Sequence, residues 1–122
     1  MSFICGNAYL IDCQFTKPPK KKYAVCVCDY DKKPLLFFIN SSPRTRFAPS
    51  SQLKIFPIDL AFLRKESYIN TADVITCDIP YTCDIIKNFG PVPDHVKQKI
   101  KKIVHESETL PNRFIKIIIS ML

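Results

Sequence analysis

Glycine is scarce in this sequence, with only two residues among 122. A flexible linker or a low-complexity segment is usually rich in glycine and polar residues, so this scarcity argues against either. The length is also too short for two independent hydrophobic cores. We therefore predict a single domain that spans residues 1–122.

The sequence also lacks a long hydrophobic run. No apolar stretch approaches the roughly 20 residues that a membrane-spanning helix needs. The opening residues 1–6, MSFICG, have neither the charged region nor the long apolar stretch of a signal peptide. We expect a protein with no membrane partner and a cytoplasmic location.

Paired metal-ligand spacing is missing as well. Six cysteines are present, which would permit three disulfides in an oxidising compartment. Cys26 and Cys28 are one residue apart, whereas zinc sites usually show C-x-x-C spacing, and neither His95 nor His105 lies near a cysteine. We expect no metal and mostly free, structural thiols, with Cys26 and Cys28 on the same face of a strand.

Positive charge is what the sequence has in excess, with a net charge of +7. A small basic domain attracts polyanions and gains affinity by displacing counterions from phosphates, so nucleic acid is the leading candidate partner. A solvated, lysine-rich surface explains the same charge without any ligand. Charge alone leaves both interpretations open.

Short, β-favouring segments fill most of the chain. Residues 7–15 alternate between two faces and predict a strand. Residues 16–22 hold two prolines and four lysines and predict a loop. Residues 23–30 and 35–40 predict a β-hairpin with a largely buried second arm, and the polar residues 41–51 predict another loop.

Weaker strand signals follow at 52–56 and 74–79, and then the period changes. Between residues 92 and 110, lysines occupy most of the surface of a predicted amphipathic helix. Its apolar face is formed by Val96, Ile100, Ile103 and Val104. Residues 112–121 fit either a strand or a second short helix, and we favour the helix, giving a helical region of about 92–121.

Small strands followed by a terminal helix fit a mainly β barrel with added α structure better than a βαβ arrangement. Five motifs add to this pattern: residues 6–12, GNAYLID; 23–29, YAVCVCD; 39–43, INSSP; 59–69, DLAFLRKESYI; and 90–93, GPVP. In these motifs the chain resembles divergent members of the PemK/MazF-like toxin family. The resemblance covers most of the chain.

This resemblance implies a small SH3-like barrel, dimeric in many family members, that cleaves single-stranded RNA without a metal or any other cofactor. It also implies a cognate antitoxin protein as partner. The implied reaction is internal phosphoryl transfer, in which the RNA 2′-hydroxyl attacks the adjacent phosphate. Such chemistry needs proton transfer and positive donors that stabilise the transition state.

The resemblance places the candidate catalytic residues at a strand end. Ser41 and Ser42 match the hydroxyl residues of the family, and Arg44 could stabilise charge beside them. An ordinary Ser-Ser-Pro turn explains the same residues without a ligand. The candidate RNA-binding residues are the basic ones: Lys20, Lys21, Lys22 and Arg46.

One family feature is absent. An arginine-proline pair is expected at the end of the first long loop, but Lys22 and Tyr23 stand there. Lysine lacks the planar fork of guanidinium and does not replace it automatically, although Arg44 or Arg46 could compensate in space. The alternative is therefore a noncatalytic SH3-like module that binds nucleic acid or protein, such as a defence-related or phage inhibitor.

Overall fold

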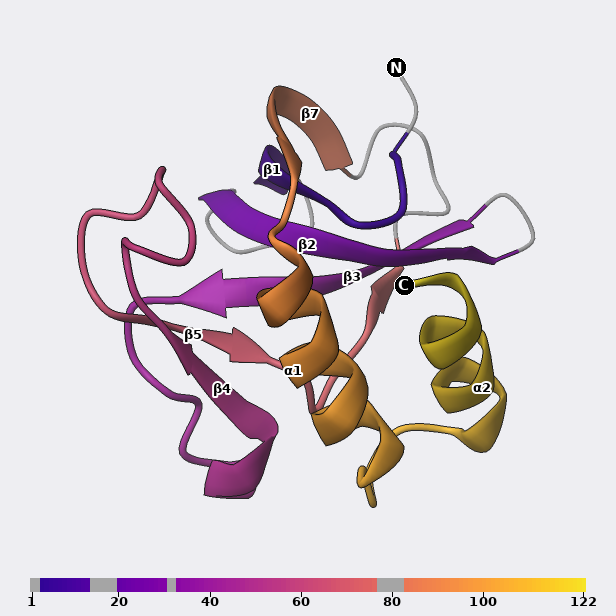
Figure 1. The fold of residues 1–122 in the computed structure, drawn as a ribbon. Coiled ribbons are helices and arrows are strands. Elements are labelled where there is room, and N and C mark those ends of the chain that lie inside the picture. The colour runs from indigo at the N-terminus through magenta and orange to yellow at the C-terminus, as the bar shows by residue number, and fades with distance from the viewer. Residues whose placement is uncertain (1–2, 14–19, 31–32, 77–82) are drawn as a thin grey trace.

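The computed structural model describes the chain except for residues 1–2, 14–19, 31–32 and 77–82. A sheet of seven strands and two α-helices make up the described part (Figure 1). The elements are β1 (Asn7–Cys13), β2 (Lys20–Tyr30), β3 (Lys33–Asn40), the 3-10 turn η1 (Pro49–Ser51), β4 (Gln52–Ile55), β5 (Ser67–Asn70), β6 (Ile75–Thr76), β7 (Cys83–Pro91), α1 (Asp94–His105) and α2 (Asn112–Met121). The prediction of a mainly β fold with added helices is confirmed.

The sheet is antiparallel throughout, in the order β4-β5-β3-β2-β1-β7, with β6 pairing with β3. The predicted hairpin of β2 and β3 forms its centre. The predicted closed barrel, however, is not found: β4 and β7 end the order on opposite sides, and no pairing within the described ranges joins them.

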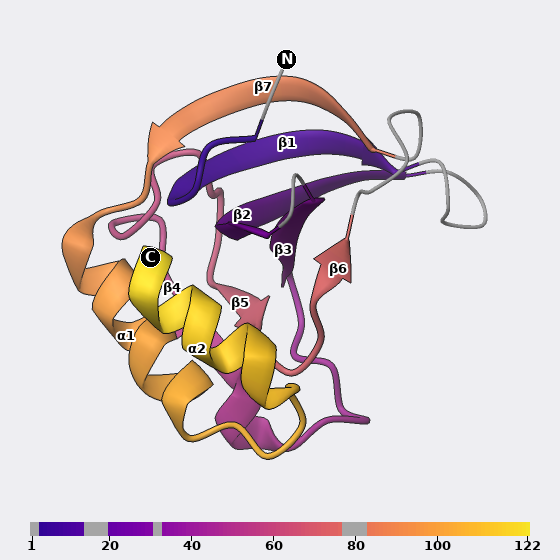
Figure 2. The same cartoon turned by 90° about the vertical axis from the view of Figure 1, so that its right-hand side faces the viewer.

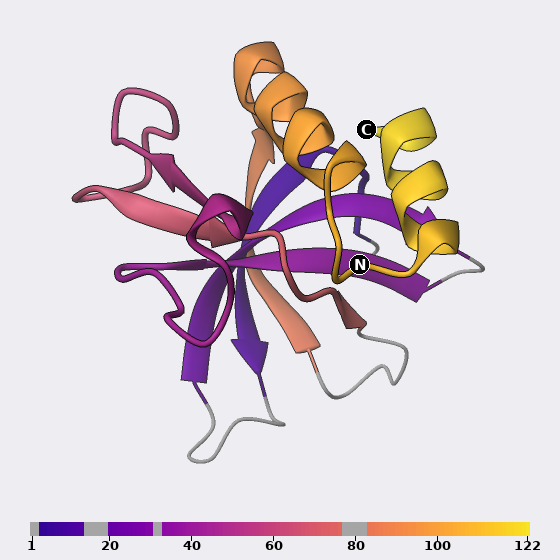
Figure 3. The same cartoon turned by 90° about the horizontal axis from the view of Figure 1, so that it is seen from below.

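Helices take the place of barrel closure. Figures 2 and 3 show α1 and α2 lying side by side against one side of the bent sheet. Val96, Ile100, Val104 and Ile118 are buried in the same core as the strand residues around Phe37. Because the helices bury this apolar face, the sheet does not need to close in order to exclude water.

Both faces of the central strands are buried. One face packs against the helices, and the other encloses a second core formed by Tyr9, Ile11, Cys13, Ala24, Cys26 and Leu36. The expected burial of both sides of the second hairpin arm is thus confirmed by β3, where Leu35, Leu36 and Phe37 are each at most 1% exposed.

A β-bulge separates the two neighbouring cysteines of β2. The register with β3 shifts between Cys26 and Cys28, so that Cys26 packs in the second core while Cys28 packs under the helices. The prediction that they share a face was wrong because the bulge adds one residue to β2. Burial raises the pKa of the Cys26 thiol to about 12, consistent with a structural role.

The lysine cluster lies in a strand and not in the predicted loop. Lys20, Lys21 and Lys22 open β2 and pair with Cys13, Asp12 and Ile11 of β1 in that order. Pairing with β1 extends β2 to Lys20, into the segment where the lysine run suggested a loop. Side chains alternate along a strand, so the three lysines do not form one patch: Lys20 and Lys21 are exposed, and Lys22 is half-buried.

Strand β7 was not predicted from the sequence. It pairs with β1 at the edge of the sheet, with two register shifts, and its polar residues Asp84, Lys87 and Asn88 are exposed. These polar residues and the shifts interrupt the alternation that identifies a strand.

The two glycines lie beside this edge and both need a positive φ, 91° at Gly6 and 84° at Gly90. The Gly6 carbonyl accepts a hydrogen bond of 2.8 Å from Val92 N–H, which ties the start of β1 to the segment that leads into α1. Side chains other than glycine rarely adopt this conformation.

The C-terminal region is helical as predicted. Helix α1 carries Asp94 in its first turn and Lys102 and His105 in its last, which suits the helix dipole. The open choice for residues 112–121 is resolved in favour of the helix, α2. Within the described residues, neither helix has the length and apolar character needed to cross a bilayer.

The role of α1 in covering the sheet can be tested by truncating Ile100, which is fully buried. We expect Ile100→Ala to lower the free energy of unfolding by about 3 kcal/mol, because the lost contacts leave a cavity. Ile58→Ala is the matched control: Ile58 is 92% exposed, so its effect should stay within about 0.5 kcal/mol. Urea denaturation measures both, and equal effects would contradict the packing described.

Candidate functional site

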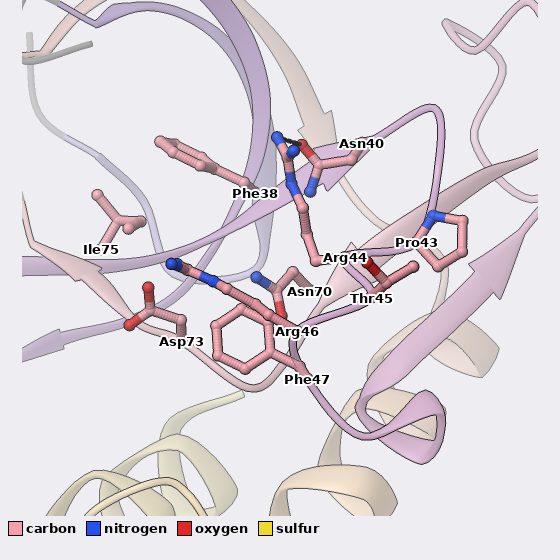
Figure 4. Close-up of a pocket in the computed structure, with 10 residues that line it drawn as sticks. All are labelled: Phe38, Asn40, Pro43, Arg44, Thr45, Arg46, Phe47, Asn70, Asp73 and Ile75. Carbon is pink, nitrogen blue, oxygen red and sulfur yellow. Dashed lines mark hydrogen bonds between the residues drawn. The ribbon is translucent and has the colours of Figure 1, made fainter.

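Two adjoining hollows lie where β3 ends. The first, which we call the Lys22 pocket, has a volume of about 360 Å³ and is lined by Lys21, Lys22, Tyr23, Ile39, Asn40, Ser41, Ser42 and Arg44. The second, the Arg46 pocket, measures about 550 Å³ and is lined by Phe38, Asn40, Pro43, Arg44, Thr45, Arg46, Phe47, Asn70, Asp73 and Ile75 (Figure 4). Asn40 and Arg44 belong to both.

Asn40 organises the boundary between the pockets. It is the last residue of β3 and is only 7% exposed. Its Oδ1 accepts hydrogen bonds from Lys22 Nζ at 2.7 Å and from Arg44 Nη2 at 3.0 Å. One neutral oxygen therefore holds two cationic side chains, one from β2 and one from the loop after β3.

Strand residues fix the loop that carries Arg44. The Arg44 N–H donates to Gln52 Oε1 at 3.0 Å, and Gln52 Nε2 donates to Asn70 Oδ1 at 2.8 Å. Gln52 and Asn70 face each other in the β4–β5 pair, and both are about 8% exposed. This chain of amides anchors the loop to the sheet beyond what a Ser-Ser-Pro turn alone provides.

Among the described residues, the two cations held by Asn40 form no ion pair with a carboxylate. Burial, with the nearby Arg44 guanidinium as a second cause, lowers the pKa of Lys22. The ion pairs found among the described residues, Lys54–Glu66 and His95–Asp59, involve neither Lys22 nor Arg44. An anion bound at Asn40 would relieve this repulsion.

Aromatic rings lie beside two of the basic residues that line the pockets, Lys22 and Arg46. Lys22 Nζ lies 5.3 Å from the centre of the Phe38 ring, and the Arg46 guanidinium lies 4.8 Å from the Phe47 ring. Tyr23 lines the Lys22 pocket but also packs against Phe62 at 5.1 Å. Phe38 and Phe47 are therefore the rings that line the larger hollow.

The structure brings most of the predicted site residues together. Ser41, Ser42 and Arg44 line the Lys22 pocket with Lys21 and Lys22. Arg46 lines the adjoining pocket, which makes it a neighbour of the same cluster. Lys20 lines neither of these two pockets.

The amide residues were missed from the sequence. Asn40 and Asn70 are each the final residue of a strand: Asn40 follows the apolar run LLFFI, and Asn70 follows Ile69 in the short strand SYIN. A polar residue that directly ends a buried strand was the available signal. It is weak, because such positions are also common in turns.

The two histidines lie outside both pockets. His95 Nε2 contacts Asp59 Oδ1 at 2.8 Å and links α1 to the loop after β4. This hydrogen bond is the main cause of the lowered pKa of Asp59. The described residues also contain no cluster of three or more His, Cys, Asp or Glu side chains that could hold a metal ion.

The energetic cost of burying the Lys22 charge can be tested through the pH dependence of the free energy of unfolding. Because the folded-state pKa of Lys22 is lowered, the unfolded chain binds more protons between that value and about 10.4, the ordinary lysine pKa. Stability linked to Lys22 therefore rises with pH in this alkaline window. We expect Lys22→Met to raise the free energy of unfolding at pH 7 and to flatten the alkaline rise.

Lys21→Met supplies the control, since Lys21 is the exposed neighbour on the same strand. Its urea denaturation curves between pH 7 and 10 should follow the wild type within about 0.5 kcal/mol. If the free energy of unfolding of Lys22→Met rose with pH as steeply as that of the wild type, the claim that burial lowers the pKa of Lys22 would be contradicted.

No protein-family model matches the sequence, and no curated protein matches it either.

Proposed function

We propose that this chain is a PemK/MazF-like protein that binds single-stranded RNA across the Lys22 and Arg46 pockets. The observation that carries the proposal is the pairing of Lys22 and Arg44 on one Asn40 oxygen. We further propose that the open, helix-covered sheet is a divergent form of the SH3-like barrel.

The anion in this proposal is a phosphate of the RNA backbone. Asn40 holds the two cations together although they repel each other, and no carboxylate of the described residues forms an ion pair with either. The Arg44 guanidinium can offer two parallel donors to phosphate oxygens, and Lys22 adds a point charge. The net charge of +7 attracts a polyanion to this position.

Single-stranded RNA fits better than a duplex because hollows lie on both sides of the cation pair. A backbone that passes over Arg44 would place one nucleotide above the Lys22 pocket and the next above the Arg46 pocket. Only unpaired bases can turn into such hollows and contact aromatic rings like Phe38 and Phe47. The family resemblance supports the same ligand.

Removing the guanidinium should weaken binding in a salt-dependent way. We expect Arg44→Gln to raise the dissociation constant for a single-stranded RNA about tenfold, since a charge-assisted phosphate contact is lost. The slope of log K against log salt should fall by about 1. Fluorescence anisotropy over a series of salt concentrations measures both quantities.

Arg113→Gln is the matched control, because Arg113 is an exposed arginine on α2 that lines neither pocket. Its affinity and salt slope should match the wild type. If both variants lost the same amount of affinity, the effect would come from net charge and not from the site. If the wild-type protein itself did not bind RNA tightly, the proposal would be wrong.

A second candidate function is metal-independent RNA cleavage by a toxin-like endoribonuclease, held inactive by a cognate antitoxin. Ser41, Ser42 and Arg44 line the same pocket as Lys22, and the lowered pKa of Lys22 makes its ammonium group a better proton donor than an ordinary lysine. The RNA 2′-hydroxyl would give up its proton to water and attack phosphorus. The P–O5′ bond would break, leaving a 2′,3′-cyclic phosphate while the departing oxygen takes up a proton.

Cleavage is tested by incubating RNA with the protein in the presence of EDTA. If the second candidate holds, Ser42→Ala should slow cleavage about 100-fold, because a donor to the transition-state oxygens is lost. Binding should remain close to the wild type. Ser50→Ala, an exposed serine outside both pockets, serves as control and as a check for contaminating nuclease.

Salt-dependent binding without turnover would instead favour the noncatalytic binding module. The substitution of Lys22-Tyr23 for the family's arginine-proline pair already points in that direction. Failure of cleavage leaves the RNA-binding proposal intact, since the two are measured separately.

A further inference from the structure

We infer that the Arg46 pocket holds one unpaired base and prefers keto bases, uracil and guanine, to the amino bases cytosine and adenine. This inference rests on the proposed RNA binding. It comes from the orientation of two buried amides, Asn40 and Asn70, which both line the pocket.

The amide of Asn40 can point in only one direction. Its Oδ1 accepts from Lys22 and Arg44, and these side chains are donors with no acceptor to offer. A flipped amide would face its NH₂ group against two cations. The Asn40 Nδ2 donor must therefore point away from the cation pair.

The amide of Asn70 is fixed in the same way. Its Oδ1 accepts from the Ala72 backbone N–H at 3.1 Å, which can only donate, as well as from Gln52 Nε2 at 2.8 Å. Neither Asn40 Nδ2 nor Asn70 Nδ2 has a hydrogen-bond partner among the described residues, yet no fully buried side-chain nitrogen there is unsatisfied. Both nitrogens are therefore partly accessible, and both belong to residues that line the pocket (Figure 4).

The deep part of the pocket consequently presents donors. The amides of Asn40 and Asn70 are about 7% and 8% exposed, whereas the carboxylate of Asp73 belongs to an exposed residue at the rim. A base edge that enters deepest meets N–H groups first. A carbonyl oxygen in this place can accept from them, whereas an exocyclic amine in the same place can accept from neither.

Size and shape agree with a base as the occupant. The volume of about 550 Å³ falls within the range of small-molecule sites. Phe38 and Phe47 supply ring surface for contact with a base, and Arg44 connects the pocket to the proposed phosphate position. An unpaired base is needed, because pairing would occupy the edge that the amides would read.

The test compares two nucleosides of nearly equal size at a time, one with a carbonyl group and one with an exocyclic amine at the same position. The neighbouring ring nitrogen changes with this group, from an N–H donor to an acceptor. Binding of short 2′-O-methyl oligonucleotides, which cannot undergo the 2′-hydroxyl attack, is measured for uridine against cytidine and for inosine against adenosine. We expect the keto member of each pair to bind about tenfold more tightly. Equal, tight binding of all four would overturn the base preference and leave RNA binding standing, whereas binding of none would remove the proposed function itself.

Asn70→Asp tests the residue directly. It keeps an acceptor for Gln52 and Ala72 but replaces the free donor with a second acceptor. We expect the keto preference to vanish or reverse, beyond a general loss of affinity from the added negative charge. Preference that persists in a folded Asn70→Asp protein would contradict the assignment to Asn70.

Asn88→Asp is the matched control for this change. Asn88 Oδ1 likewise accepts two hydrogen bonds, from Asn7 Nδ2 at 3.2 Å and from Gly90 N–H at 2.8 Å, and Asn88 lines neither pocket. It should lower affinity slightly for all four oligonucleotides and leave their ratios unchanged. The comparison in wild-type protein needs no variant, so the inference remains testable even if Asn70→Asp fails to fold.

Discussion

The candidate site depends on one hydrogen-bond acceptor, the Oδ1 of Asn40, which receives both Lys22 and Arg44. Two cations that repel each other, the half-buried Lys22 and the exposed Arg44, are held together at the end of β3. The strand pairing of β2 with β3 delivers Lys22, and the amide chain through Gln52 delivers Arg44. Because the Asn40 oxygen is neutral, its hydrogen bonds hold the two cations without neutralising them. Their positive charge therefore remains available to bind an anion.

The helices allow this site to exist at one end of an open sheet. Because α1 and α2 bury the apolar face, the short strands β4 and β5 can remain at an edge and hold the Arg44 loop through Gln52 and Asn70. The site lies where these strands end and shares part of its lining with the cores: Ile39 belongs to the core under the helices, and Phe38 packs against the second core. A substitution in α1 should mainly lower the stability of the fold. A substitution of Gln52 or Asn70 should mainly change the position of the loop that carries Arg44.

Local periodicity made part of the fold predictable from the sequence. The β2–β3 hairpin and α1 are continuous patterns, and both are confirmed. Strand β7 and the separation of Cys26 from Cys28 were not predictable, because bulges and register shifts are decided by pairing with distant segments. For the same reason, residues were found within the site that no motif had indicated, such as Asn70, whose role exists only opposite Gln52.

The phosphate position and the base preference have a common origin. Lys22 and Arg44 occupy the Asn40 oxygen because they can only donate, and this forces the amide nitrogen away from them. The interaction that keeps positive charge available at the boundary therefore also turns a donor toward the Arg46 pocket. If Lys22 lost its proton, Arg44 would still donate to the Asn40 oxygen and would keep the amide in the same orientation. Loss of the Lys22 proton, whose pKa is lowered by burial and by Arg44, would therefore reduce the positive charge at the boundary and leave the Asn40 donor turned toward the Arg46 pocket.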